Sequence, residues 1–204
     1  MSGNKAHWED IYRDKAQEEV SWHQAQPVMS LRLIEQAGVG PAEPVIDVGG
    51  GASHLVDHLL DRGFADVTVL DLAGAALAQA KERLGQRGVS VRWIEADATA
   101  WQPERTYRLW HDRAVFHFLT EPDDRAAYLE RLRAAVPAGG HAVIATFAPD
   151  GPERCSGLPV VRYSPEALQA TLGDGFELAA MQAEEHRTPG GQPQQFMGCL
   201  FRRR

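Results

Sequence analysis

Glycines and acidic residues gather where predicted strands end, and these residue types are suited to ligand binding. The apolar run 44–48 contains Asp47 and leads directly into Gly49, Gly50 and Gly51. Glycine lets the backbone turn tightly and approach a ligand closely. Open α/β sheets bind their ligands at the carboxyl ends of the strands, so we interpret this glycine turn as part of a binding site.

The spacing of the small residues limits which ligand the turn can hold. A turn that binds a dinucleotide has a third small residue, which lets the amino end of the following helix meet the pyrophosphate. In this sequence that position is His54. The bulky imidazole argues against pyrophosphate binding and leaves a shorter pattern, in which an aspartate is followed by alternating glycines.

Two further acidic residues follow predicted strands. Asp71, with Leu72 behind it, ends the second strand, and its carboxylate can accept hydrogen bonds from both hydroxyls of a ribose. Asp97 follows the third strand, where it can accept a hydrogen bond from an adenine amino group while Ala98 forms an apolar wall. Together with Asp47, these residues predict a crevice that binds a nucleoside.

The elements that must position these residues follow from alternating apolar and helical patterns. Short strands separated by helices indicate βαβ crossovers and a mostly parallel, doubly wound sheet. A loop at 20–24 separates the first two helices. We expect helices at 6–17, 27–37, 53–62, 74–84 and 122–136, and strands at 44–48, 67–70, 89–95, 107–111 and 141–147.

The carboxyl-terminal part of the chain follows a different pattern. A loop rich in Gly and Pro, 148–159, precedes a helix that Ser164 can cap. The strands expected at 176–185 and 195–202 are joined by a link too short for a crossover helix, so they form a hairpin. The whole pattern predicts an α/β fold with a doubly wound, Rossmann-like, seven-stranded, mostly parallel sheet and an antiparallel C-terminal hairpin.

Length and composition are those of one globular unit. The 204 residues are 44% hydrophobic and 24% charged, and we expect a single domain over 1–204 whose segment 1–40 forms a helical cap. No apolar run is long enough to span a membrane. The polar amino terminus lacks the features of a secretory signal, so we expect a cytoplasmic protein.

Charge and cysteine content disfavour two kinds of ligand. The net charge is −7, and only the terminal residues 202–204 form a basic run, so we expect no nucleic-acid partner. Cys155 and Cys199 lie far apart without a C-x-x-C partner, and the histidines show no ligand spacing. We therefore expect two reduced thiols and no metal site.

These motifs resemble those of the class I S-adenosylmethionine-dependent methyltransferases over most of the chain. The resemblance implies S-adenosylmethionine as the cofactor, with the glycine turn facing its methionine part. It also implies that Asp71 faces the ribose and that Asp97 and Ala98 face the adenine. The matching pieces are 47–51, Asp71, 95–98, the turn 137–140 and the C-terminal hairpin.

Two positions depart from the family pattern. Gly50 stands where many members have Cys, and Ser53 stands where a further glycine is common. A protein that binds the cofactor without turnover therefore stays open as an alternative. A dehydrogenase is disfavoured by His54.

The segment 107–119 bears on the methyl acceptor. It lacks the N/D-P-P-Y/F tetrapeptide of members that methylate nucleobases or glutamine amides, so those acceptors are not expected. The run 112–114, Asp-Arg-Ala, is similar to the D-R-G of thiopurine methyltransferases and to the D-K-G of some protein lysine methyltransferases. The tail from Cys155 onward is similar to that of tellurite-resistance methyltransferases, which favours soft sulfur, selenium or tellurium acceptors.

Three residues lie at the end of the expected fourth strand or just beyond it, where a cation or dipole can favour an acceptor anion. Of these, we interpret His117 and Arg113 as candidate catalytic residues and His111 as a candidate cofactor-binding residue. His117 can instead be a half-buried histidine, and Arg113 can pair with Asp112. Trp22 can cover a cationic sulfonium, or it can pack two helices together.

The sequence thus predicts a methyltransferase that uses direct in-line displacement onto a small-molecule nucleophile, with a thiol or other soft chalcogen as the favoured acceptor. A protein lysine methyltransferase stays open, because an acidic surface can dock a basic protein substrate. We expect Trp8 in the core and the loop that holds Cys155 above the pocket.

Overall fold

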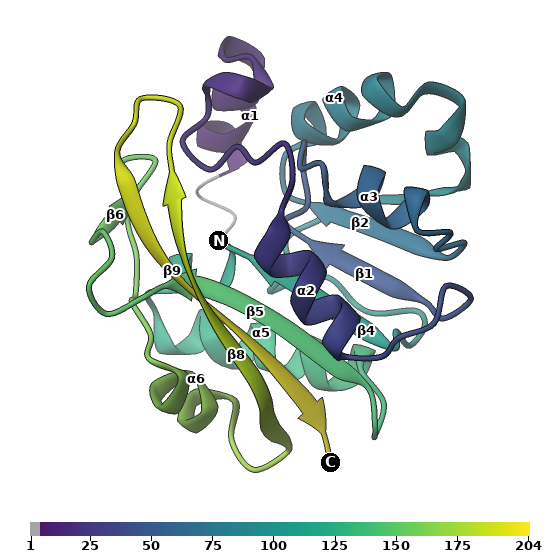
Figure 1. Cartoon of the computed structure of the whole chain (residues 1–204), viewed down its shortest axis with the longest axis vertical. Coiled ribbons are helices and arrows are strands. Elements are labelled where there is room, and N and C mark those ends of the chain that lie inside the picture. Colours follow the sequence, from purple (N-terminus) through teal and green to yellow (C-terminus); the bar gives the residue numbers. More distant parts are fainter. Residues whose placement is uncertain (1–4) are drawn as a thin grey trace.

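A seven-stranded sheet forms the centre of the protein, for which the computed structural model describes residues 5–204 (Figure 1). Its strands are β1 (Val45–Val48), β2 (Val67–Asp71), β3 (Arg92–Glu95), β4 (Leu109–Arg113), β5 (His141–Phe147), β8 (Phe176–Arg187) and β9 (Pro193–Arg203). Their order is β3-β2-β1-β4-β5-β9-β8. The first five are parallel, whereas β9 is antiparallel to β5 and β8 to β9. The predicted fold class is confirmed.

Helices cover both faces of this sheet. In Figure 1, α2 and α3 lie in front of the sheet, while α5 and α6 lie behind it. No helix within residues 5–204 is long and apolar enough to cross a membrane. The helices are α1 (Lys5–Asp14), α2 (Val28–Gln36), α3 (Leu55–Asp61), α4 (Gly74–Leu84), α5 (Pro122–Ala135) and α6 (Pro165–Leu172), with the 3-10 turns η2 (Gln17–Glu19), η3 (Gly85–Ser90) and η4 (Phe116–Phe118).

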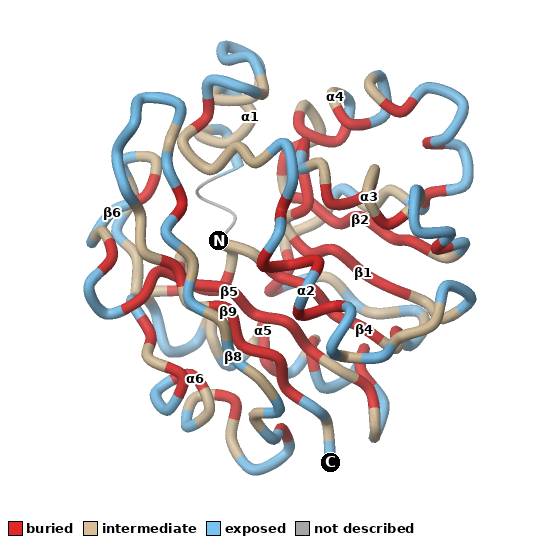
Figure 2. Tube along the Cα trace, in the orientation of Figure 1, coloured by how far each residue is buried: buried red, intermediate tan, exposed pale blue. Residues whose placement is uncertain are grey.

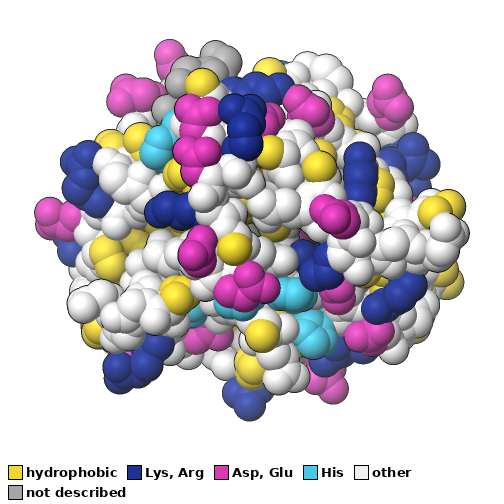
Figure 3. All heavy atoms as spheres, turned by 90° about the horizontal axis from the view of Figure 1, so that it is seen from above, with side chains coloured by type: hydrophobic (Ala, Val, Ile, Leu, Met, Phe, Trp, Pro, Cys, Tyr) yellow, Lys and Arg dark blue, Asp and Glu magenta, His cyan; other side chains and the backbone are white. Residues whose placement is uncertain are grey.

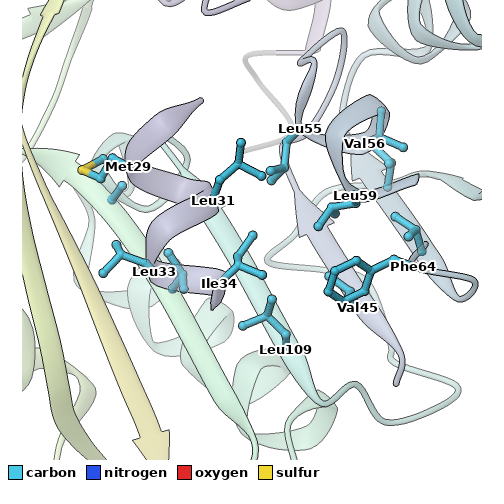
Figure 4. Close-up of a cluster of buried hydrophobic side chains, with 14 of the residues drawn as sticks. Met29, Leu31, Leu33, Ile34, Val45, Leu55, Val56, Leu59, Phe64 and Leu109 are labelled. Atoms are coloured by element: carbon cyan, nitrogen blue, oxygen red, sulfur yellow. The ribbon is translucent and has the colours of Figure 1, made fainter. Parts of the chain in front are cut away.

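Side chains alternate between two hydrophobic cores, one on each face. Val45 of β1 and Leu109 of β4 pack with α2 and α3, as Figure 4 shows, whereas Ile46 and Trp110 belong to the core beneath α5 and α6. Figure 2 shows that the central strands are buried along their length. Because side chains alternate along a strand, a polar residue at position 47 faces α2.

Most predicted boundaries agree with the structure to within two residues, but the first helix, predicted at 6–17, ends at Asp14. The third strand begins only at Arg92, because Gly85–Ser90 forms a 3-10 turn. The fourth strand runs to Arg113, so His111 and Arg113 lie within it and not beyond it. A small additional hairpin, β6 (Arg154–Cys155) with β7 (Leu158–Pro159), lies in the loop expected to be irregular. Ser164 caps α6 as predicted, accepting a hydrogen bond from the backbone of that helix.

A buried polar network joins β4 to α5 on the rear face. The Tyr128 hydroxyl donates to Asp112 Oδ2 at 2.6 Å and accepts from Trp110 Nε1 at 2.8 Å. The other oxygen of Asp112 accepts from the backbone amide of Val115 at 2.9 Å. Burial raises the pKa of Asp112 to about 6. The network fixes the turn by which the chain leaves β4.

We expect Tyr128→Phe to destabilise the fold by about 2–3 kcal/mol, because it leaves a buried indole N–H and a buried carboxylate short of a partner. Urea unfolding at pH 7.5 measures the change. Tyr163→Phe is the control, since Tyr163 is also buried but its hydroxyl bridges no such pair. An equal loss in both variants would contradict the role given to the network.

Candidate active site

A crevice with two lobes opens at the carboxyl ends of the parallel strands. Four residues line both lobes: Tyr12, Trp22, Gly49 and Arg113. Including the open solvent at their mouths, the lobes have volumes of about 690 Å³ and 560 Å³. The larger, here called the apolar lobe, is also lined by Trp8, Leu70, Asp71, Leu72, Ala96, Ala98, Ala114, Val115, Phe118 and Cys155. The smaller, the polar lobe, is also lined by Gln17, Val20, His23, Gln24, Pro27, Ser30, Asp47, Gly50, Ala52, Ser53, His54, Leu55 and His111.

The glycine turn forms the floor between the lobes and has no room for side chains. Gly49 has a φ of +68°, and a Cβ atom there would overlap the side chain of Val115. A Cβ atom at Gly51, whose φ is +43°, would lie 2.7 Å from Asp71 Oδ2. A Cβ atom at Gly50 would overlap the Asp47 carboxylate. Gly49 and Gly50 line the crevice, whereas Gly51 lies behind it against Asp71.

Asp71 ends β2 and lines the apolar lobe beside Leu72, as predicted. Its Oδ1 accepts from the backbone amide of Ala73 at 2.8 Å, which fixes the carboxylate. Burial raises its pKa to about 7, and the nearby charges of Asp47 and Glu9 act in the same direction. Because only Oδ1 accepts this backbone hydrogen bond, Oδ2 of the fixed carboxylate can accept hydrogen bonds from a pair of ribose hydroxyls.

Asp97 and Ala98, which were predicted to bind the adenine together, have different surroundings in the structure. Ala98 and Ala96 line the apolar lobe, but Asp97 is not among the lining residues. Its Oδ1 accepts from the backbone amide and the hydroxyl of Thr99, at 2.9 and 2.7 Å. Asp97 therefore shapes the loop that presents the two alanines as an apolar wall.

His111 and Asp47 meet under the polar lobe. They are register partners on β4 and β1, and His111 Nδ1 donates to Asp47 Oδ1 at 2.7 Å. His111 Nε2 shares a hydrogen bond of 2.8 Å with the hydroxyl of Ser30 on α2. All three residues are at most 3% exposed. The sequence pointed to Asp47 and His111, but only the strand register and α2 bring Ser30 to them.

Arg113 reaches both lobes and is held by the C-terminal hairpin. Its guanidinium lies over the Phe196 ring, 4.3 Å from the centroid, and its Nη2 lies 3.7 Å from Glu184 Oε1. Nη1 donates to the backbone oxygen of Trp22 at 3.3 Å, whereas Nε and Nη2 have no hydrogen-bond partner. Its ion-pair partner is thus Glu184, and the considered pairing with Asp112 is wrong, because Asp112 faces Tyr128.

His117 lies in the core and lines neither lobe. Its Nδ1 accepts from the backbone amide of Phe147 at 3.4 Å, and its ring packs against Phe118 and Phe147. Burial, with the charge of Arg113, lowers its pKa to about 3. It is neutral at pH 7, so the cationic role considered for it is wrong. The reason is the strand boundary: β4 extends to Arg113, and η4 turns His117 inward.

Aromatic residues from the amino-terminal segment roof the apolar lobe. Trp8 packs edge-on against Trp22 and Phe118, with centroids 5.6 and 5.2 Å apart, so the prediction that Trp8 is a core residue is wrong. Trp22 Nε1 donates to the Tyr12 hydroxyl at 3.2 Å. Trp8 and Tyr12 are four positions apart and therefore share one face of α1, a signal that the sequence contained.

Polar contacts hold α1 over the crevice. Glu9 accepts from the backbone amides of Gly74 and Ala75 at the start of α4, at 2.7 and 3.3 Å. Lys5 pairs with Glu95. Figure 3 views the molecule from above Figure 1, and charged side chains of both signs are interspersed on that face.

Two residues of the apolar lobe bear on acceptor chemistry. Cys155 is buried, and burial raises the pKa of its thiol to about 11, so it is a protonated wall residue. Ala114 has a φ of +69°, a region that glycine favours. It stands where the similar D-R-G and D-K-G patterns have glycine. Within residues 5–204, no group of three His, Cys, Asp or Glu side chains could hold a metal ion.

Comparisons with known proteins agree with this geometry. A family model described as a methyltransferase domain matches residues 45–140. The matched segment is a little under half of the chain. The match confirms the resemblance noted in the sequence to the class I methyltransferases.

One protein with a similar sequence is a protein methyltransferase of mouse. The eEF1A lysine and N-terminal methyltransferase of Mus musculus is 25% identical over 137 residues, which are 66% of this chain and 19% of the relative. The chain thus spans about a fifth of that relative's length.

Solved structures show the fold. A structure from a study of the conversion of a disulfide bond into a thioacetal group during echinomycin biosynthesis has a TM-score of 0.77 and 20% identity, covering 98% of this chain and 92% of that one. The 1,6-didemethyltoxoflavin-N1-methyltransferase of Burkholderia thailandensis, with bound S-adenosylhomocysteine, has a TM-score of 0.69 and 21% identity, covering 98% and 84%.

The raised pKa of Asp71 predicts how stability depends on pH. Its folded pKa of about 7 lies above its ordinary value of 3.8, so its contribution to stability is fully present below pH 3.8 and is lost as the pH rises through 7. We expect Asp71→Asn to be more stable than wild type at pH 8 by about 1–4 kcal/mol, and nearly equal to it at pH 3.5.

Urea unfolding at the two pH values measures this difference. Asp66→Asn is the control, since Asp66 is a partly exposed carboxylate paired with Arg105 and should give no gain at pH 8. A gain of the same size at both pH values for Asp71→Asn would show that burial of charge is not its cause.

Proposed function

We propose that this chain is an S-adenosylmethionine-dependent methyltransferase whose acceptor is a small-molecule nucleophile, with a thiol or other soft chalcogen anion as the favoured class. The observation that carries the proposal is the two-lobed crevice, whose polar and apolar lobes share Gly49 of the glycine turn and Arg113. A crevice with one polar and one apolar lobe suits a ligand that has an amino-acid end and a nucleoside end and that binds next to the Arg113 cation. The family match and the fold support the same cofactor.

The residues present fit that cofactor. Asp71, Leu72 and Ala98 would hold its nucleoside part, and Asp47 with the glycine turn its methionine part. Because Gly49 and Gly50 have no side chains, the backbone of the turn can pack closely against Val115 and Asp47 and still line the crevice, where a ligand can approach it. When bound, S-adenosylmethionine supplies a methyl group already activated on a sulfonium, so an acceptor lone pair displaces a neutral thioether without a covalent enzyme intermediate.

Arg113 defines the chemistry at the acceptor end. It is a fixed cation against the apolar walls formed by Trp8, Phe118 and Cys155. A cation in surroundings of low polarity favours the anionic form of an acceptor. Thiols titrate near neutral pH and need no further base. The described residues of the apolar lobe include one carboxylate, Asp71, which is suited to ribose, and no imidazole that could take a proton from an amine.

Protein lysine methylation is the second candidate, because the similar mouse protein is named for lysine methylation. Against it, a lysine ammonium would approach the guanidinium of Arg113, and like charges repel. The echinomycin-related structure concerns sulfur chemistry, which favours the soft acceptor.

We expect labelled methyl transfer to members of a panel of small thiols, and about a 100-fold lower kcat/KM in Arg113→Ala, because the acceptor anion loses its cation. The pH–rate profile should shift to higher pH in Arg113→Ala and less so in Arg113→Lys. Arg162→Ala is the control, since Arg162 pairs with Glu153 outside the crevice.

Binding of S-adenosylhomocysteine by titration calorimetry separates the possible failures. Asp71→Ala should weaken it about tenfold or more, which is 1.4 kcal/mol. Binding without transfer to any thiol would favour the reading without turnover, and a labelled protein band from a lysate would favour the lysine acceptor. An absence of binding would contradict the assignment of S-adenosylmethionine as the cofactor.

A further inference from the structure

We infer that His111 is a positioning residue that acts through Asp47 and sets the negative charge offered to the ammonium of the cofactor's methionine end. The inference rests on the proposed function. Its basis is the buried chain Ser30–His111–Asp47, whose two hydrogen bonds of 2.8 and 2.7 Å end at the floor of the polar lobe. All three residues line that lobe.

The geometry leaves one oxygen of Asp47 for a ligand. Oδ1 is taken by His111, whereas Oδ2 lies against Gly50 at the lining of the polar lobe. A carboxylate buried to 2% exposure needs partners for both oxygens. The described structure provides the imidazole for the first oxygen, and a ligand ammonium in the polar lobe would provide a partner for the second.

The imidazole determines how much charge the pair carries. With a neutral ring, His111 donates through Nδ1 and Asp47 keeps its full negative charge. With a protonated ring, the pair is neutral overall and attracts an ammonium less strongly. Affinity for the methionine end should therefore fall when the His111 ring gains a proton. Ser30 holds the ring in place by its bond to Nε2.

Other titratable groups surround the same lobe and must be separated from His111. They are Tyr12 from α1, His23 from the loop before α2, His54 at the start of α3, and Arg113 from the end of β4. Burial raises the pKa of Tyr12 and lowers that of His54. Val143 of β5, the neighbour of His111 in the sheet, is apolar.

The test compares two ligands that differ only at the methionine end. S-adenosylhomocysteine has the ammonium and carboxylate, and 5′-methylthioadenosine lacks both, so the ratio of their affinities cancels the titration of Asp71 at the ribose. In wild type we expect the affinity for S-adenosylhomocysteine, divided by that for 5′-methylthioadenosine, to fall about tenfold, or 1.4 kcal/mol, between pH 7.5 and 5.5. In His111→Asn, which keeps a donor for Asp47 but cannot become charged, it should change less than twofold.

Matched variants isolate the residue. His54→Asn and His23→Asn remove the other imidazoles of the lobe and should keep the wild-type dependence on pH. His111→Phe leaves Asp47 without its donor and should lower the ratio at every pH. If His111→Asn fails to fold, nuclear magnetic resonance of the wild-type histidine rings gives the answer: S-adenosylhomocysteine should suppress protonation of the His111 ring at pH 6, and 5′-methylthioadenosine should not.

The outcomes are distinct. Wild-type protein that binds neither ligand overturns the proposed function and this inference together. Binding with the same pH dependence in wild type and His111→Asn, or equal effects of both ligands on the His111 ring, overturns the inference alone and leaves the proposed function standing.

Discussion

The crevice depends on the close packing of the glycine turn between β2 and the exit from β4. Because Gly49 lies directly against Val115 and Gly51 against Asp71, the ends of three strands come together without intervening side chains. This contact leaves the backbone of the turn as the floor of both lobes. Its position in turn requires the backbone after β4 to be fixed, which the Asp112 carboxylate does by accepting from the amides of Val115 and Phe116.

Strand register then divides the polar residues between the two faces. Asp47 and His111 are paired across β1 and β4 and face α2, whereas Asp112, one position further on, faces α5. The same alternation takes Arg113 back toward the hairpin, where Phe196 and Glu184 hold it. Residues 111–114 thus have four different roles, because each points in a different direction from its neighbour. His111 hydrogen-bonds to Asp47, and Asp112 anchors the segment through Tyr128. Arg113 supplies a cation, and Ala114 begins the turn.

Much of this arrangement was predictable from the sequence, and the rest depended on contacts between distant residues. The helix at 74–84 and the strand at 141–147 were predicted with their observed ends, since their periodicity is local. The extent of β4 was not, because its pairing with β1 sets it, and the role assigned to His117 failed with it. Trp8 was misplaced for a related reason: helical spacing identifies a face of α1 but not what that face covers.

The distribution of charge in the crevice determines which charged groups of a ligand each lobe attracts. Asp47 lines the polar lobe and Asp71 the apolar lobe, each fixed by a hydrogen bond, while Arg113 lies where the lobes meet. A ligand with a cationic amino acid at one end is attracted by the first carboxylate, and an anion is attracted by the guanidinium. Because Glu184 approaches Arg113 only to 3.7 Å without a hydrogen bond, the guanidinium is held in place but is not neutralised as a close pair would be. The hairpin formed by β8 and β9 therefore sets the polarity around Arg113.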